Sequence, residues 1–323
     1  MAAISGGWPL LGAVLYTAAF NHKQMALLYA PAFFAHLLGR SLQSAHPMRR
    51  VAALGLAVLA TMLLLWWPFL RQPGPLAVAA RLAPLGRGVF EDYVASFWCV
   101  TSPLVKWRQR FAAPVLARAA IALSLAGCAP AMAQQIMRPS RAGLLYAMLN
   151  CAFSAFLFGF QVHEKTILFP LLPAALLARR ELRLLRVLGP LAALSMYPLL
   201  RFERLSAAYA VCIAAAVVIL GGGPPGDGAA DTTAPPELLS ARSFTAWAAV
   251  AAVGGAALHA AYLWVPAPTW APHAHALALS AFCAAHFGAA AVYANARQWQ
   301  LPAEEEPRAA AGRVTRKAAR KAA

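Results

Sequence analysis

Long apolar runs separated by short polar stretches dominate this chain. About 20 consecutive apolar residues cross the hydrocarbon core of a bilayer as a helix, and this pattern predicts about ten transmembrane helices. The expected spans are residues 2–20, 25–38, 51–70, 111–133, 142–160, 166–178, 187–200, 205–220, 244–265 and 275–295. Three of these segments, 25–38, 166–178 and 187–200, are short for a span. The sequence therefore predicts an all-α polytopic membrane protein.

The interruptions between the apolar runs predict how the chain is divided. Residues 71–110 contain no uninterrupted span, so we expect a long extramembrane or re-entrant segment whose helical part, 93–105, lies along the interface. The runs RRELRLLR and RFER read as polar connections between spans. A glycine- and proline-rich run follows residue 220 and cannot pack. The expected parts are a transmembrane bundle with its loops (1–220), a flexible linker (221–243), C-terminal transmembrane helices (244–295) and a basic tail (296–323).

Composition supports the membrane interpretation and excludes a soluble domain. Hydrophobic residues make up 61% of the 323 positions, and the mean hydropathy is +0.59. The net charge of +17 comes mainly from loops and the tail, which is typical of the positive-inside rule, so we expect no nucleic-acid partner. The five cysteines have no paired spacing. Neither a disulfide framework nor a metal site is expected.

Basic loops predict the orientation of the bundle. With the basic tail in the cytosol, alternation of the spans places the arginines of RRELRLLR and those near residues 40–50 and 138–141 on the same side, as the positive-inside rule prefers. The same alternation places three polar islands together on the opposite side. They are NHKQ (21–24), the charged and aromatic segment 81–99, and VHEK (162–165).

These islands are the candidate binding site. Ionisable groups at membrane depth are costly, so a cluster of them indicates function. Arginine and lysine suit phosphate, whereas amides and carboxylates suit sugar hydroxyls. The candidate substrate-binding residues are Asn21, Lys23, Gln24, Arg81, Arg87, Glu91, Asp92, His163, Glu164 and Lys165. The alternative for each island is structural: a hydrated turn at NHKQ, an interfacial aromatic belt at 81–99, and a salt bridge with a helix cap at VHEK.

The islands resemble one family in order and spacing. FNHKQMALLYAP, RLAPLGRGVFEDYVASFWC and FLFGFQVHEKTIL are similar to the signature segments of the dolichyl-phosphate-glucose α-1,3-glucosyltransferases of the endoplasmic reticulum. The run from Phe90 to Cys99 is similar to the pattern of the first-glucose enzyme. Tyr93 and Ser96 depart from it, because the family usually has lysine and asparagine there, so a charge contact at position 93 is not implied.

The resemblance implies a GT-C type glycosyltransferase fold in the endoplasmic reticulum membrane, with the active-site loops in the lumen and the C-terminus in the cytosol. It also implies inverting transfer of glucose from dolichyl phosphate glucose to a lipid-linked high-mannose oligosaccharide for protein N-glycosylation, without a cofactor. The partners are these two substrates and membrane lipid. The catalytic base of the family is an aspartate upstream of the matched region. We therefore expect this chain to be the C-terminal portion of the enzyme, with an unknown catalytic residue and no activity alone.

Two alternatives stay open at this point. The second-glucose enzyme of the same family differs in its acceptor and not in its chemistry. A transporter or a non-catalytic membrane scaffold belongs to another class, and a transporter would usually show repeated halves, which this sequence does not contain.

Overall fold

The computed structural model describes residues 1–70, 78, 93–221 and 238–301. All regular elements in these ranges are helices, as the apolar runs predict. The α-helices are α1 (Ala2–Ser5), α2 (Pro9–His22), α3 (Ala30–Leu42), α4 (Pro47–Leu70), α6 (Phe97–Val105), α7 (Trp107–Arg110), α8 (Ala113–Met137), α9 (Arg141–Phe158), α10 (Leu168–Leu176), α11 (Ala178–Ser195), α12 (Tyr197–Phe202), α13 (Ser206–Gly221), α14 (Ala241–Trp264) and α15 (Ala274–Gln300). Two 3₁₀ helices, η1 (Gln24–Tyr29) and η2 (Glu164–Ile167), lead into α3 and α10.

Six helical segments of the described chain are long and apolar enough to cross a membrane, rather than the ten expected. They are Gln24–Leu42, Pro47–Leu70, Ala113–Met137, Arg141–Phe158, Ala241–Trp264 and Ala274–Gln300. The other expected spans do form helices, but α2, α10 and α13 are shorter than 18 residues, and α11 carries too many charges. The coarser conclusion, an all-helical multi-pass membrane protein, is confirmed.

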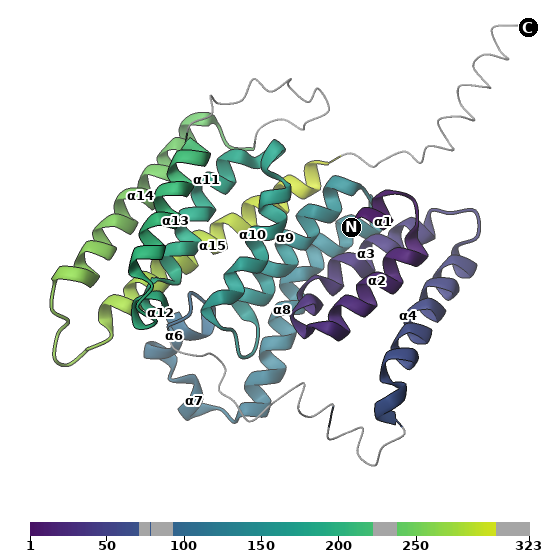
Figure 1. The fold of residues 1–323 in the computed structure, drawn as a ribbon, viewed down its shortest axis with the longest axis horizontal. Coiled ribbons are helices and arrows are strands. Elements are labelled where there is room, and N and C mark those ends of the chain that lie inside the picture. Colours follow the sequence, from purple (N-terminus) through teal and green to yellow (C-terminus); the bar gives the residue numbers. More distant parts are fainter. Residues whose placement is uncertain (71–77, 79–92, 222–237, 302–323) are drawn as a thin grey trace, which may run out of the picture.

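The helices pack around α9, which crosses the centre of the bundle (Figure 1). Most of α9 is buried, and α8, α15, α10 and α3 surround it. Close approach to α8 depends on small residues: a Cβ on Gly127 of α8 would lie 2.2 Å from the Ser154 hydroxyl of α9, whose Oγ donates to the Ser124 carbonyl oxygen at 2.7 Å. Such small residues let membrane helices come within van der Waals contact of each other.

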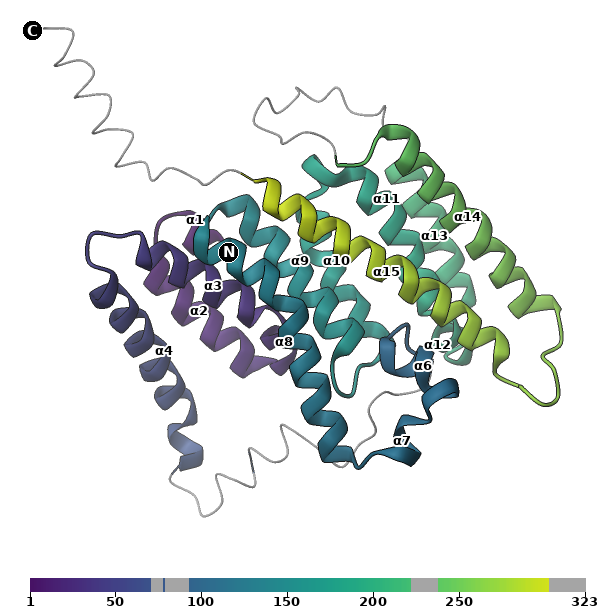
Figure 2. The ribbon, with the colours of Figure 1, turned by 180° about the vertical axis from the view of Figure 1, so that it is seen from behind.

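α4 stands at one side of the bundle (Figures 1 and 2) and contains no buried residue. It packs on α2 and α3. The main polar link to α2 is Asn21, whose amide oxygen accepts from the Trp66 indole nitrogen at 2.8 Å and whose amide nitrogen lies 3.0 Å from the Met62 sulfur. α4 is thus held to the bundle along one line of contact, and the rest of its surface is exposed.

The interpretation of RRELRLLR as a connection between spans is wrong, because these residues belong to α11. Leu184, Val187, Leu188 and Leu191 are buried at helical spacing, and arginine side chains are long enough to reach the membrane surface from such a helix. A local break occurs at Glu181, whose backbone angles, φ −131° and ψ 40°, are not helical. RFER likewise overlaps α12, and the expected helix 93–105 begins later, at Phe97.

Glu181 forms the centre of a buried charged cluster that joins α9, α11 and α15. Its carboxylate accepts hydrogen bonds from the Tyr146 hydroxyl, from the Tyr293 hydroxyl at 2.8 Å and from the Arg297 Nε at 2.8 Å. The side chains of Glu181 and Arg297 are 4% and 7% exposed. Buried charges persist in this form because each is paired and hydrogen-bonded.

Candidate functional site

One end of the bundle collects the loops that the sequence analysis placed on one side. The ends of α2 and α9, the starts of η2 and α6, the short helix α12 and the loop between α14 and α15 all lie at this end (Figures 1 and 2). We call this end of the bundle the cavity end, after the cavity described below. The start of α11 and the end of α15 lie at the other end of the bundle. The described parts of all three polar islands therefore occur at the same end, as the alternation of spans predicts.

The VHEK island is a sharp turn between α9 and η2. α9 ends at Phe158, and Gln161 adopts a left-handed backbone with φ 59°. His163 then caps η2, because its Nδ1 lies 3.3 Å from the Lys165 amide nitrogen. Thr166 and Ile167 are buried and hold the turn against the bundle. This geometry sends Glu164 inward, where it is 3% exposed, and Lys165 outward.

Glu164 pairs with its neighbour. Its Oε2 lies 2.9 Å from the Nδ1 of His163, whose side chain is 40% exposed. The same nitrogen is also within reach of the Lys165 amide, at 3.3 Å. The shorter contact with the carboxylate is satisfied when Nδ1 carries a proton, because two acceptors would otherwise face each other. The His163 Nδ1 thus lies between the Lys165 amide and the buried Glu164 carboxylate.

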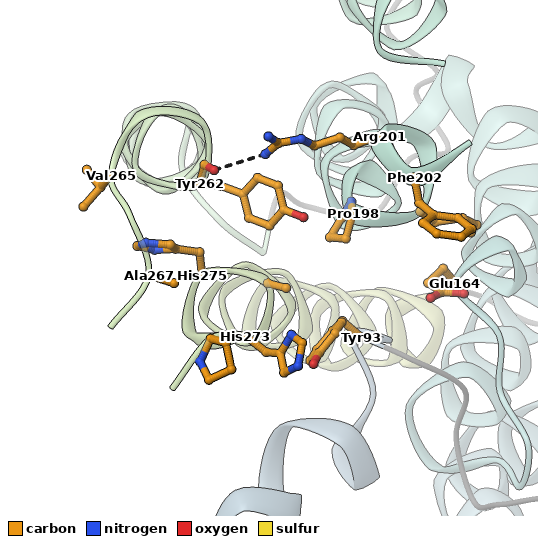
Figure 3. A pocket seen from close by; sticks show the side chains of 13 residues that line it. Tyr93, Glu164, Pro198, Arg201, Phe202, Tyr262, Val265, Ala267, His273 and His275 are labelled. Carbon is orange, nitrogen blue, oxygen red and sulfur yellow. Dashed lines mark hydrogen bonds between the residues drawn. The ribbon is translucent and has the colours of Figure 1, made fainter. Parts of the chain in front are cut away.

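Glu164 lines a cavity of about 670 Å³, a size typical of small-molecule sites. The walls come from the segment before α6, from η2, α12 and the end of α14, and from the loop that leads into α15. Figure 3 shows Glu164 at one side, Arg201 and Tyr262 across from it, and Tyr93 beside His273. The lining residues are Tyr93, Glu164, Pro198, Leu199, Arg201, Phe202, Tyr262, Val265, Ala267, Pro272, His273, His275 and Ala276.

Arg201 and Tyr262 form the cationic side of this cavity. The Arg201 guanidinium donates to the Tyr262 carbonyl oxygen at 3.3 Å, and its carbon lies 5.2 Å from the centre of the Tyr262 ring. An arginine over an aromatic face keeps its charge while its position is restricted. The cavity therefore combines a buried carboxylate, a fixed cation and aromatic rings, which together suit a ligand with hydroxyls and a negative charge.

α6 fixes the position of Tyr93. Ser96 is the N-cap of α6 and accepts from the Cys99 amide at 3.4 Å. Trp98 is 2% exposed, and its indole N–H donates to the Phe158 carbonyl oxygen at 2.8 Å. The Tyr93 carbonyl in turn accepts from the Ser280 hydroxyl of α15 at 2.8 Å. The described part of the 81–99 island is thus attached to both α9 and α15.

A second opening adjoins the cavity. This groove has a volume of about 1010 Å³ and shares Tyr93, Pro272 and His273 with the cavity. Its walls are largely apolar side chains of α6 and α15, whereas Lys106 and Arg108 line its rim. Lys106 has a left-handed backbone, φ 53°, and separates α6 from α7. An apolar groove with cations at its mouth suits a lipid chain that carries an anionic head.

The structure brings together only some of the predicted site residues. Glu164 lines the cavity, with His163 and Lys165 next to it on the same turn. Lys23 and Gln24 are exposed at the start of η1, at the cavity end but not among the residues lining the cavity. The amide of Asn21 is engaged by α4, as described above. Arg81, Arg87, Glu91 and Asp92 lie outside the described residues.

Sequence reasoning missed Arg201, Tyr262, His273 and His275. The RFER run (201–204) was a signal for Arg201, because it is a charged stretch between two apolar segments. The alternation of spans places it on the same side of the membrane as the three polar islands. The two histidines occur in the run PHAHA beside a tryptophan. Tyr262 has no such signal, since it sits inside an apolar helix. Among the residues that the structure describes, no group of three or more His, Cys, Asp or Glu side chains could hold a metal ion.

Fold and site together define a multi-pass helical membrane protein with a polar cavity and an adjoining apolar groove at one end, an arrangement suited to a lipid-linked ligand. The family model described as the ALG6, ALG8 glycosyltransferase family matches residues 1–293. The chain belongs to this family.

Several named proteins are similar to the chain over part of their length. A probable dolichyl pyrophosphate Man9GlcNAc2 alpha-1,3-glucosyltransferase of Arabidopsis thaliana is 44% identical over 201 residues, which are 62% of this chain and 38% of that protein. The Saccharomyces cerevisiae protein named as this glucosyltransferase is 39% identical over 210 residues, covering 62% of the chain and 39% of the relative. The Mus musculus protein of this name is 37% identical over 177 residues, covering 54% and 35%. The matched region thus spans about two fifths of the relatives' length.

Proposed function

We propose that this chain forms the substrate-binding part of an α-1,3-glucosyltransferase. The enzyme transfers glucose from dolichyl phosphate glucose to a lipid-linked Man9GlcNAc2 oligosaccharide in the endoplasmic reticulum, with its site in the lumen. Membership of the ALG6, ALG8 family supports the reaction class. The observation that carries the proposal is the polar cavity with Glu164 in its wall, joined to an apolar groove with cations at its rim.

The names of the relatives favour the first glucose over the second. Relatives from plant, yeast and mouse are all named for the Man9GlcNAc2 acceptor. An acceptor that already carries one glucose would be the substrate of the second-glucose alternative. We therefore propose the Man9GlcNAc2 oligosaccharide as the acceptor, attached to its lipid in the same membrane.

In the proposed donor complex, the polyprenyl chain lies in the groove beside α6 and α15. Its phosphate then lies at the polar rim of the groove beside Lys106 and Arg108, with Arg201 in the wall of the adjoining cavity. Cations are required there because the negative charge on the leaving phosphate grows in the transition state. Lys165 and Arg87 have the same proposed role on the islands.

The acidic residues have the complementary role. Glu164 is proposed to accept hydrogen bonds from sugar hydroxyls, with the neighbouring His163 imidazole, 2.9 Å from its carboxylate, holding it in position. Glu91 and Asp92 are proposed to orient cations or bind hydroxyls. An inverting transfer also needs one carboxylate base to deprotonate the acceptor hydroxyl. We assign that base to an aspartate upstream of the region that this chain shares with its relatives.

The test is glucose transfer from a synthetic polyprenyl phosphate glucose to the lipid-linked acceptor in membranes. The chain is joined to the N-terminal part of the Arabidopsis thaliana relative, so that the assay contains a complete enzyme. Arg87→Ala, His163→Ala, Lys165→Ala and Glu164→Gln are compared with Arg242→Ala, a matched change of an exposed arginine on the first turn of α14. The amount of membrane-integrated protein is measured for each variant.

We expect transfer to fall by about 10² to 10³ when a donor to the leaving phosphate is lost, and to be unchanged in Arg242→Ala. Normal transfer by all four island variants would refute the binding roles and leave the islands as caps and turns. Absence of transfer to Man9GlcNAc2 by the unmodified enzyme, with transfer to the monoglucosylated acceptor, would replace the first-glucose assignment by the second.

A further inference from the structure

A third opening lies away from the cavity, on the flank of the bundle. It is a groove of about 410 Å³ between α11, α13 and α14. α11 packs against both other helices, whereas within the described residues α13 packs on α11 and α12 and hardly touches α14. The groove therefore runs along α11, which forms its floor, and α13 and α14 form its two side walls. We call it the flank groove.

The walls of the flank groove are apolar along most of their length. On α14 the lining residues are small and include Ala248, Ala252 and Gly255, and on α11 and α13 they include Pro190, Leu191 and Val217. Ala248 and His259, at the two ends of the α14 wall, are 11 residues apart, about 16 Å along a helix. This apolar channel follows the middle of α14, a helix long and apolar enough to cross a membrane, and has space for a single alkyl chain.

The two ends of the flank groove differ in charge. Toward the cavity end it is closed by Tyr209 and His259, whose hydroxyl and Nδ1 are 3.2 Å apart, with the Tyr197 ring 4.1 Å from the imidazole. At the opposite end Arg186 is part of the lining. Arg183 lies one turn earlier on α11, so two arginines follow the same side of this helix.

Arg186 is five residues beyond the break at Glu181 in α11, about 8 Å along the helix. A guanidinium on its long side chain reaches the headgroup region from this depth. By the positive-inside rule this end of the bundle faces the cytosol, the side where basic pockets between membrane helices bind anionic lipid headgroups.

We propose that the flank groove is a binding site for an anionic phospholipid of the cytosolic leaflet, with one acyl chain along α14 and the headgroup phosphate at Arg186. The charge argues for an anionic lipid, because the choline of a zwitterionic headgroup would be repelled by Arg183 and Arg186. The site is separate from the cavity and independent of the proposed glucosyl transfer.

The test compares lipid binding to the full chain in nanodiscs of phosphatidylcholine, with or without phosphatidylinositol. Retained lipid is counted by native mass spectrometry, and the shift in Tm on adding phosphatidylinositol is measured. Arg186→Gln removes the charge, and Ala252→Leu fills the channel from an exposed position. Their matched controls are Arg242→Gln and Ala257→Leu, which lie on α14 outside the groove lining.

We expect phosphatidylinositol to be retained in preference to phosphatidylcholine and to raise the Tm of the unmodified chain and of both controls. Arg186→Gln should lower this preference about fivefold, because one arginine near an anionic surface contributes about that factor. Ala252→Leu should reduce total retained lipid by one molecule. Equal retention of the two lipids by the unmodified chain would overturn the proposal even if a variant failed to fold. A change of oligomeric state on filling the groove would instead assign it to a second copy of the chain.

Discussion

The buried carboxylate of Glu181 allows a quantitative test of what holds the bundle together. It accepts from two tyrosine hydroxyls and from the Arg297 guanidinium, and both charged side chains are more than nine-tenths buried. Neutral hydrogen bonds between membrane helices average only about 0.6 kcal/mol. Removing one member of a buried ion pair costs about 3–5 kcal/mol, because the other charge is left without compensation. The charge therefore dominates the expected effect.

Glu181→Ala should lower the free energy of unfolding by about 3–5 kcal/mol, a large part of the roughly 5–15 kcal/mol that holds a protein folded. The double variant Glu181→Leu with Arg297→Met removes both charges and should cost less than Glu181→Ala alone. Glu203→Ala is the matched control, since this carboxylate is exposed and surface changes are usually within about 0.5 kcal/mol.

Reversible unfolding of the full chain in mixed micelles, followed by circular dichroism, measures these differences. Glu181→Leu and Arg297→Met are also measured singly, and the double-mutant cycle that they form with the double variant should give a coupling free energy of about 0.5–3 kcal/mol. A loss below about 1 kcal/mol for Glu181→Ala, together with additive single variants, would show that the cluster is not a stabilising ion pair and would refute the reasoning.

Three further outcomes follow from helix packing and orientation. Gly39→Ala should destabilise the bundle by about 1–3 kcal/mol, because its Cβ would lie 2.3 Å from the Gln135 carbonyl oxygen. Gly55→Ala is the contrasting change: its Cβ meets nothing within 4 Å, so it should stabilise α4 by up to about 1 kcal/mol. Thermal unfolding of the two variants measures both effects. Trp98→Ala should cost about 3–5 kcal/mol and expose α6 to proteolysis, and equal digestion of variant and parent would contradict this. A glycosylation sequon in the loop between α14 and α15 should be modified in microsomes, and one between α3 and α4 should not; the reverse pattern would invert the orientation.

The main features of the fold follow from the apolar pattern, and its errors have physical causes. Runs of about 20 apolar residues identify most of the long spans. The apolar pattern gave a wrong prediction at RRELRLLR, because the charged residues there were taken as a connection between two membrane helices. Leu184, Val187, Leu188 and Leu191 repeat at helical spacing on the buried face, while the arginines occupy the other positions. An amphipathic helix that buries one face against the bundle has this appearance, and periodicity was the better guide.

The candidate site was predictable in position but not in detail. The basic loops place the polar islands at one end, and the described parts of the islands do lie there. The convergence of Glu164, Arg201 and Tyr262 depends on how α12 and α14 close over η2, which no local pattern encodes. The same is true of Glu181 and Arg297, which are 116 residues apart in the chain. The contacts of the Asn21 amide with Trp66 and Met62 of α4 were not predictable either, because they join residues more than 40 positions apart in the chain.

The position of the Glu181 cluster limits how the cavity can change width. α11 and α15 are joined by this cluster at the end of the bundle away from the cavity, and nearer the cavity the Cys283 thiol of α15 lies 3.7 Å from the Leu191 carbonyl oxygen of α11. From Cys283 to His275 only 8 residues of α15 remain, about 12 Å, so a tilt of about 5° would move the cavity wall by about 1 Å. The two helices therefore hold the cavity walls at a nearly constant spacing, and a bulky, branched substrate has to be admitted by movement of the segments that connect the helices.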